Sequence, residues 1–243
     1  MKTKNYLYFF ASFLLVISSC KKSATPPVTF ASTTYDFLSP YDTAGTPINM
    51  LKDVISSNLL TFIDTTLPDG KNLTLSHPEL FVKTANNDLV ITQHSNVFVT
   101  FIFGATSGTN ALAFYTYPTN NPPQSSKDVY KITYIFPSAG KKTGLKPGDK
   151  MNLGTFDAGT SIGFVLMISA WDQTSKKLNN NALHYCSDDI LNPEVDPNLR
   201  KHAVFINYSP EKKTIVGFED QDRSSTSCDN DFNDVTFYTT VLN

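Results

Sequence analysis

The chain has 243 residues, of which 40% are hydrophobic, 12% are aromatic and only 17% are charged. This composition is typical of a packed globular domain rather than a disordered tail. The formal net charge of −2 argues against nucleic acid as a partner. The charge is unevenly distributed, because residues 188–234 contain 11 acidic and 5 basic residues, a local net charge of −6. Such a concentration of negative charge calls for a cation.

Residues 1–19 have the layout of a secretory signal peptide. Two lysines, Lys2 and Lys4, precede an apolar stretch of 12 residues, Tyr6 to Ile17. A helix that crosses a membrane needs about 20 apolar residues, so this stretch is too short to be a membrane span. The residues Ile17-Ser18-Ser19-Cys20 resemble the lipobox of bacterial lipoproteins, in which the signal is cleaved before the cysteine and the thiol is acylated. The alternative is an ordinary signal peptide with an incidental cysteine.

Lipid on Cys20 predicts a protein of the cell envelope whose first partner is a membrane. Two or more acyl chains anchor a protein stably, whereas one chain holds it only marginally. We expect an outer-membrane lipoprotein, and the sequence leaves open whether it faces the periplasm or the cell surface. Residues 20–46 form the expected linker from the lipid, because residues 21–34 are rich in Ser, Thr and Pro.

A short helical segment is expected over residues 47–66, before a β domain over residues 67–243. Apolar residues recur there at steps of three and four, which is helical spacing. Beyond Gly70 the apolar period changes to two, in short runs rich in β-branched and aromatic residues that are separated by turn sequences. The pattern predicts an all-β fold, a β-sandwich or jelly roll. The expected strands are Asp88–Gln93, Val97–Phe103, Ala111–Tyr117, Val129–Phe136, Ser161–Trp171, Ala203–Tyr208, Thr214–Phe218 and Val235–Val241.

The densest chemical signal lies between the last two expected strands. Six carboxylates fall within 16 residues and are offset only by Arg223. Neighbouring carboxylates repel each other and raise each other's pKa, and a hard divalent cation relieves both problems. Calcium takes six to eight oxygen ligands, so we predict a calcium site. The candidate ligands are Glu219, Asp220, Asp229, Asp231, Asn233 and Asp234, and Asp222 belongs to the same acidic segment.

The spacing of these acids suggests an extended loop and excludes an EF-hand. Alternation at Asp229, Asp231 and Asn233 would point three oxygen ligands to one side, with Phe232 buried on the other. An EF-hand loop starting at Asp229 would need Gly where the chain has Asp234 and Glu where it has Thr240. A solvated acidic loop without a metal is the simpler alternative.

Cys186 and Cys228 remain as a pair once Cys20 is assigned to lipid. Disulfides persist in exported compartments, so we expect a bridge between the two residues. Such a bridge would close a loop of 42 residues. Two unpaired thiols are the alternative, and a cysteine-based metal site is not expected because the chain has no CxxC pair.

Three patterns could suggest an enzyme or a sugar-binding surface, and none is convincing. Residues 159–163 match GxSxG around Ser161, but a strand-like run follows where that motif needs a helix. The four histidines are scattered, which does not support catalytic zinc. The aromatic rings of Tyr115 and Tyr117 would share one face of a strand, where core packing is more common than sugar stacking.

The FED sequence at 218–220 followed by DNDFND at 229–234 resembles the signature of a bacterial domain family of unknown function, seen in LruC-type lipoproteins. Further matching segments run through residues 65–243, among them HPELF at 77–81, IFPSAG at 135–140 and LNPE at 191–194. The resemblance implies an exported β-sandwich for which calcium binding is inferred and no catalytic activity is established. By position, the motif residues of the family correspond to the six candidate ligands above.

The resemblance adds two details to the site. Asn192 and Glu194 of LNPE would lie in the same neighbourhood as the acids. The chain departs from the family pattern at Gly104, where a typical member carries an acidic residue, which puts a ligand at that position in doubt.

The function expected from these observations is that of a non-enzymatic binding or adhesion module stabilised by calcium, with a glycan or a surface protein as its ligand. A hydrolase of polysaccharides is the alternative from another class, because glycosidases use a pair of carboxylates. A purely structural envelope protein is the third.

Overall fold

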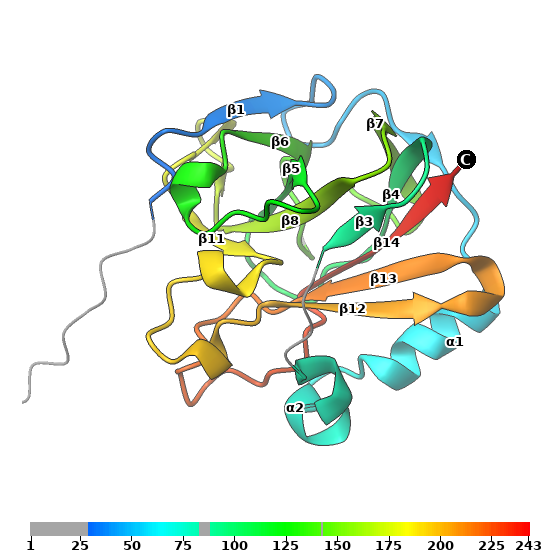
Figure 1. Ribbon diagram of the computed structural model, residues 1–243, viewed down its shortest axis with the longest axis vertical. Coiled ribbons are helices and arrows are strands. Elements are labelled where there is room, and N and C mark those ends of the chain that lie inside the picture. The colour runs from blue at the N-terminus through cyan, green and yellow to red at the C-terminus, as the bar shows by residue number, and fades with distance from the viewer. Residues whose placement is uncertain (1–28, 83–87, 142) are drawn as a thin grey trace, which may run out of the picture.

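The computed structural model describes residues 29–82, 88–141 and 143–243. The predicted signal peptide and Cys20 lie outside the described residues. Two six-stranded sheets stand face to face, and short helices lie outside them (Figure 1). The prediction of an all-β sandwich is confirmed. In the described part of the chain, no helix is both long enough and apolar enough to span a membrane.

The first sheet has the strand order β1-β6-β5-β8-β11, and β3 also pairs with β8. The strands β11 and β3 contact different halves of β8, at its last and first residues respectively. Its strands are β1 (Thr34–Phe37), β3 (Leu89–Ile91), β5 (Ala111–Pro118), β6 (Lys131–Phe136), β8 (Thr160–Ile168) and β11 (Leu183–Cys186).

The second sheet has the order β12-β13-β14-β4-β7-β2, and its neighbouring strands are antiparallel. A separate two-stranded ribbon is formed by β9 (Trp171–Asp172) and β10 (Lys177–Leu178). The strands of the second sheet are β2 (Leu51–Lys52), β4 (Ser95–Phe103), β7 (Asp149–Phe156), β12 (Ala203–Tyr208), β13 (Lys213–Phe218) and β14 (Val235–Leu242).

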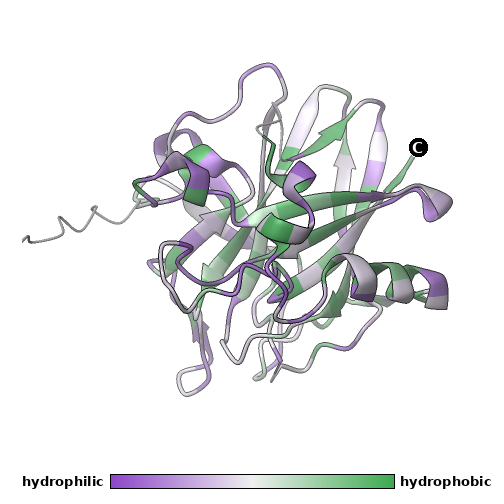
Figure 2. Cartoon of the chain, turned by 90° about the horizontal axis from the view of Figure 1, so that it is seen from below, coloured by the Kyte–Doolittle hydropathy of each residue, from purple (hydrophilic) through white to green (hydrophobic). Residues whose placement is uncertain are grey.

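The core lies between the two sheets, where alternate side chains of each strand meet. Phe114 and Phe164 of the first sheet and Phe218 and Phe237 of the second belong to this buried cluster. Figure 2 shows the same division, with hydrophobic colour concentrated in the strands and hydrophilic colour in the loops. Burial of these aromatic rings, together with the aliphatic side chains around them, holds the two sheets together.

The outer face of the second sheet is covered by α1 (Ser57–Thr66) and α2 (Leu73–Ser76), which lie beneath β12 and β13 in Figure 1. Helix α1 begins after Ser56, whose hydroxyl accepts a hydrogen bond from the backbone N–H of Leu59 at 3.1 Å. Single 3-10 turns occur at η1 (Pro78–Phe81), η2 (Ser126–Asp128), η3 (Asp189–Leu191), η4 (Pro197–Leu199) and η5 (Ser209–Glu211).

The structure corrects the predicted N-terminal elements. Only the second half of the expected helix 47–66 is helical, since residues 51 and 52 form β2 and pair with β7. Part of the expected linker also belongs to the fold, because β1 pairs in parallel with β6. Pairing with distant strands overrides local helical spacing in the first case and a polar, Ser/Thr-rich composition in the second.

Strands β7 and β11 were not predicted from the sequence. Strand β7 carries polar residues and Gly154, which adopts a φ of +114°, so its β-propensity is low. Its alternate side chains, among them Met151 and Leu153, are nonetheless buried in the core. Strand β11 has only four residues and lacks a β-branched side chain. Both strands are specified by their neighbours more than by their own sequence.

Candidate metal centre

The acidic segment, residues 219–234, is the loop that connects the neighbouring strands β13 and β14. Strand β13 ends at Phe218 and β14 begins at Val235, and these two residues face each other in the antiparallel register. Glu219 and Asp234 therefore emerge side by side at the end of the sheet. The remaining acids lie on the loop between them.

One set of ligands, which we call the strand-end group, consists of Glu219, Asp220 and Asp234. One carboxylate oxygen from each residue lies within 4.8 Å of the others. The backbone N–H of Asp220 donates to Asp234 Oδ2 at 2.8 Å, which fixes the two strand ends to each other. Since calcium–oxygen distances are about 2.3–2.6 Å, a single ion can contact all three oxygens.

A second set, which we call the loop group, consists of Glu219, Asp229 and Asp231, whose oxygens also lie within 4.8 Å of one another. Asp231 is buried, and its two oxygens accept hydrogen bonds from the backbone N–H groups of Gly70 at 2.8 Å and Asn233 at 3.1 Å. Asp229 is exposed to solvent. The loop group therefore opens to water on one side.

Two buried oxygen atoms of the cluster have no hydrogen-bond donor among the described residues. They are Glu219 Oε2 and Asn233 Oδ1, on side chains with exposed fractions of 0% and 1%. A buried polar atom without a partner costs about 1–3 kcal/mol. A bound cation would remove this cost, so the donor set fits a hard metal ion such as calcium.

The electrostatics of the carboxylates point the same way. Burial, together with the charges of Asp220 and Glu219, raises the pKa of Asp234 to about 9. Burial also raises the pKa of Glu219 and of Asp231, and the charge of Asp229 adds to both shifts. Each shift means that without a cation the native fold disfavours the ionised acids.

The loop is not a regular extended strand, because Asn230 and Phe232 adopt left-handed conformations with φ of +56° each. The prediction that Phe232 is buried is confirmed, since its exposed fraction is 0%. Its ring packs edge-on against Phe81, with 5.1 Å between the ring centroids. Position 217 is a glycine because a Cβ there would lie 2.2 Å from the carbonyl oxygen of Phe232.

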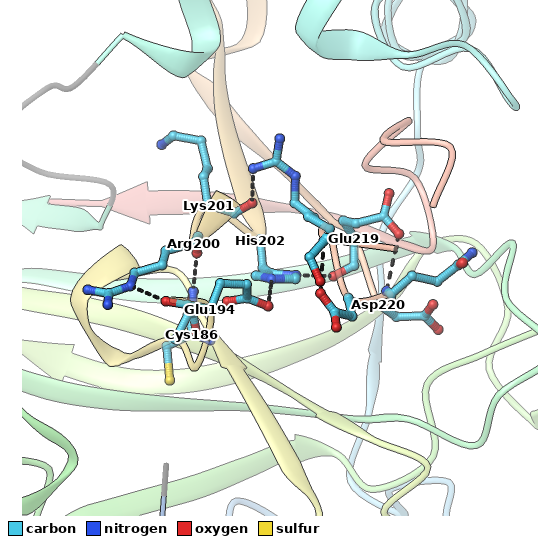
Figure 3. A network of polar contacts seen from close by, with 12 residues as sticks. Cys186, Glu194, Arg200, Lys201, His202, Glu219 and Asp220 are labelled. Atoms are coloured by element: carbon cyan, nitrogen blue, oxygen red, sulfur yellow. Dashed lines mark hydrogen bonds and ion pairs between the residues drawn. The ribbon is translucent and has the colours of Figure 1, made fainter. Parts of the chain in front are cut away.

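His202 holds the backbone of Glu219 from two sides (Figure 3). Its Nδ1 donates to the carbonyl oxygen of Glu219 at 3.0 Å, and its own carbonyl oxygen accepts from the N–H of Glu219 at 3.0 Å. The other ring nitrogen lies 2.8 Å from Glu194 Oε1, and the imidazole stacks on Tyr185 with 3.5 Å between ring centroids. This buried network fixes the position from which Glu219 reaches both groups.

Arg223 organises the loop through hydrogen bonds to Asn230 and to backbone carbonyl oxygens. Its Nε donates to Asn230 Oδ1 at 2.8 Å, and its Nη1 donates to the carbonyl oxygen of Lys201 at 3.0 Å. The guanidinium also lies over the rings of Phe81 and Phe232, at 5.4 and 5.2 Å from their centroids. Arg223 therefore shapes the backbone of the loop, and its charge also interacts with Glu219.

All six predicted ligands are found at this end of the sandwich. Five carboxylates fall into the two groups, and Asn233 lies beside them, with its Nδ2 donating to the carbonyl oxygen of Leu67 at 3.4 Å. Asp222 lies outside both groups and accepts from the N–H of Ser224 within its own turn. The predicted neighbours from the LNPE segment are close but are not in either group.

Those two neighbours have supporting roles. Asn192 bonds to the backbone of Cys186 in both directions, at 2.7 and 2.8 Å, and to the carbonyl oxygen of Arg200 at 2.6 Å. Glu194 Oε1 lies 2.8 Å from Nε2 of His202, which in turn holds the backbone of Glu219. Gly104 has no side chain that could serve as a ligand, and a Cβ at that position would lie 2.8 Å from the backbone of Gly140.

Two contributors were missed in the sequence. Asn110 is buried, and its Nδ2 donates to Asp220 Oδ2 at 2.8 Å while its Oδ1 accepts from the N–H of Ser169. Gly70 supplies the N–H that binds Asp231. Both residues lie within residues 65–243, over which the chain resembles the family, and this was the one signal that could have pointed to them. Their contacts with Asp220 and Asp231 could not be predicted because they are far from the acidic segment along the chain.

The predicted disulfide between Cys186 and Cys228 is contradicted, since both cysteines are free. Side chains alternate along a strand, and Tyr185 on β11 faces His202, on the side of the acidic segment. Cys186, the next residue, therefore faces the opposite way and packs in the cluster on the outer face of the first sheet. Burial raises the pKa of its thiol well above the usual value.

The other sequence motifs have structural explanations. Ser161 is fully buried in β8 and lies 2.9 Å from the hydroxyl of Thr119, with no helix after it. Tyr115 and Tyr117 face the same way and stack at 6.1 Å between ring centroids, as predicted. Tyr115 is buried, and a Cβ on Gly163 would lie 2.1 Å from its ring, so this aromatic residue belongs to the core.

Comparison with known proteins gives one match. No curated protein and no solved structure matches the chain. Residues 156–241, which run from the end of β7 to the end of β14 and include every predicted ligand, match a family model described as "Domain of unknown function (DUF4114)". The predicted resemblance to a bacterial domain of unknown function is thereby confirmed over this part of the chain.

Proposed function

We propose that the chain is a calcium-dependent, non-enzymatic binding module of the cell envelope. The observation that carries the proposal is the buried Glu219 Oε2, which has no hydrogen-bond donor among the described residues and belongs to both groups of carboxylates. Calcium is favoured over magnesium because it accepts irregular sets of six to eight oxygens, whereas magnesium needs near-ideal octahedral geometry. The ion would fix the loop that joins β13 to β14.

The geometry gives less support to hydrolysis of polysaccharides. Glycosidases separate their two carboxyl groups by about 5–5.5 Å or 6.5–9.5 Å and expose them to a sugar ring. Here the oxygens of each group lie within 4.8 Å of one another, and Glu219 is fully buried. Buried, crowded carboxylates are better suited to binding a metal ion than to acting on a sugar ring.

The calcium proposal is tested by thermal unfolding in calcium, in magnesium and in chelator. Binding should stabilise the fold by about 2.7 kcal/mol when free calcium is 100 times the dissociation constant. The double change Asp229→Asn and Asp231→Asn should abolish most of the calcium-dependent rise in melting temperature. A matched control, Asp36→Asn with Asp157→Asn, removes the same charge from side chains that are 59% and 84% exposed, and should keep the full response.

A melting temperature of the unmutated protein that is indifferent to calcium and chelator would end the calcium proposal. Equal loss of response in the control pair would show that net charge, rather than ligation, produces the effect.

The binding role and the anchor are tested separately. An array of glycans probed in calcium and in chelator should show calcium-dependent binding without release of reducing sugar; release of sugar would favour the hydrolase. Replacing Cys20 by Ala should release the protein from membranes, and a variant that still sediments with salt-washed membranes would refute the lipid anchor.

A further inference from the structure

The arrangement of the acids also bears on the number of ions, which the calcium proposal leaves open. The five carboxylates do not form one set of mutually close oxygens. They form the strand-end group and the loop group, which share only Glu219. Ligands on opposite sides of one calcium ion are about 5 Å apart, so each group has the span of one coordination sphere.

Separate parts of the fold support the two groups. The strand-end group is held by the ends of β13 and β14 and by Asn110, which binds Asp220. The loop group is held by Gly70, whose N–H binds Asp231, and by the left-handed residues of the loop. Each group therefore has its own framework, and Glu219 lies where the two frameworks meet.

The charge of the cluster is consistent with two divalent ions. Its five carboxylates carry a formal charge of −5, and Arg223, the arginine of the same loop, offsets one of these charges while it hydrogen-bonds Asn230 and the carbonyl oxygen of Lys201. Adding the +1 of Arg223 to −5 gives −4, so one divalent ion would leave −2 in a largely buried site, whereas two would leave 0. Uncompensated buried charge is costly, so the second ion removes a penalty that the first cannot.

Glu219 has the free coordination capacity that a bridging ligand needs. Its Oε1 accepts a hydrogen bond from the N–H of Gln221 at 3.2 Å, its carboxylate also interacts with the side chains of Asp234 and Cys228, and its Oε2 has no donor among the described residues. Asn233 Oδ1, also buried and without a donor there, offers a neutral oxygen on a residue whose backbone N–H donates to Asp231 Oδ1 at 3.1 Å. The unpartnered oxygen of Asn233 is an observation independent of the acids, because this residue is uncharged and belongs to neither group.

We propose that this end of the sandwich binds two calcium ions, one in the strand-end group and one in the loop group, bridged by the carboxylate of Glu219. This inference rests on the proposed calcium function and extends it from one ion to a coupled pair. Because one residue serves both ions, binding of either should order a ligand of the other.

The test is the calcium stoichiometry of the full chain, measured by equilibrium dialysis with radioactive calcium and by native mass spectrometry. The unmutated protein should bind two ions. The pair Asp220→Asn and Asp234→Asn should leave one ion in the loop group, and the pair Asp229→Asn and Asp231→Asn should leave one in the strand-end group. Glu219→Gln should weaken both sites by at least tenfold.

The outcomes separate the two proposals. One ion in the unmutated protein, lost in both double variants, would overturn the bridged pair and leave the calcium function standing. No bound ion would overturn both. Two ions of which neither is weakened by Glu219→Gln would overturn the bridge. Circular dichroism in chelator checks that each variant is folded, and the stoichiometry of the unmutated protein decides the number of ions even if a variant is not.

Discussion

The pKa values of partly buried carboxylates are shifted in opposite directions at the two ends of the strand pair β13–β14. Near the end where β13 begins, Asp53 accepts hydrogen bonds from Lys150 Nζ at 3.1 Å and from the hydroxyl of Tyr238 at 2.9 Å. Burial alone would raise the pKa of Asp53, but these bonds and the charges of Lys150 and Lys213 lower it below its usual value. At the other end, burial and neighbouring acids raise the pKa of Asp234 to about 9.

The difference lies in where the compensating cation comes from. At the end where β13 begins, the compensating charges are those of Lys150 in β7 and Lys213 in β13. The second end presents carboxylates and backbone groups, and the arginine of its loop is turned to other partners. An acid that the protein does not neutralise is stable only when protonated or when an ion is supplied from solution. The contrast therefore separates a structural ion pair from a candidate binding site within one sheet.

The largest expected effect concerns a third kind of buried acid, Asp88, whose hydrogen-bond donors are hydroxyl groups rather than lysines. Its oxygens accept hydrogen bonds from the hydroxyls of Ser187 and of Tyr117. Burial raises its pKa to about 7; the hydrogen bonds from Ser187 and Tyr117 oppose the shift, while the charges of Asp188 and Asp189 add to it. The native state therefore keeps a proton that the unfolded chain releases near pH 4, and stability is lost as pH rises toward 7.

Asp88→Asn should remove this dependence. Relative to the unmutated protein, the variant should gain about 2–3 kcal/mol of unfolding free energy between pH 5 and pH 7. Denaturant titrations in chelator at these two pH values measure the change without a contribution from calcium. Parallel stability curves for the two proteins would show that Asp88 does not retain its proton.

The next prediction contrasts the two ends directly, by the same substitution at each. In chelator at pH 7, Asp53→Asn should destabilise the fold by about 1–2 kcal/mol, because it weakens charge-assisted hydrogen bonds. Asp234→Asn should instead stabilise it by at least as much, because at pH 7 the native fold must protonate Asp234, whose pKa is about 9, whereas Asn needs no proton. In saturating calcium, Asp234→Asn should instead destabilise the fold, since a calcium ligand has been lost. Destabilisation by both variants in chelator would remove the distinction between the two ends.

The smallest effect is expected from Tyr238→Phe, which deletes one hydrogen bond to Asp53. The ring keeps its place beneath Lys213, whose Nζ lies 4.2 Å from the ring centroid, so packing should be unchanged. The loss should be about 1 kcal/mol and independent of calcium. Thermal unfolding in chelator and in calcium checks both statements, and a calcium-dependent loss would show that the two ends are coupled.

The sequence was sufficient to predict the sandwich and the ligands that share one short segment. The central strands were identified because runs rich in β-branched and aromatic residues lie between turn sequences, as in β4 and β14. The acids were identifiable because repulsion among six carboxylates within 16 residues is unfavourable in any conformation. Local rules were enough where the physical cause was itself local.

The sequence was insufficient where a contact joins distant segments. Asn110 and Gly70 reach the acids only through the fold, and His202 acts on the backbone of Glu219 rather than through a recognisable motif. The disulfide failed for the same reason, because which face of β11 carries Cys186 depends on the register of the sheet. An even number of cysteines says nothing about that register.

The register of Phe218 opposite Val235 makes residues 219–234 a loop whose two ends are fastened only by non-covalent contacts. An ion held between Glu219 and Asp234 would fasten that loop in the way a covalent crosslink does, by restricting the conformations open to the chain. Unlike a crosslink, this fastening is reversible and follows the concentration of free calcium. Cleavage by proteases within the loop should therefore slow as the concentration of free calcium rises, and it should not change when a reducing agent is added.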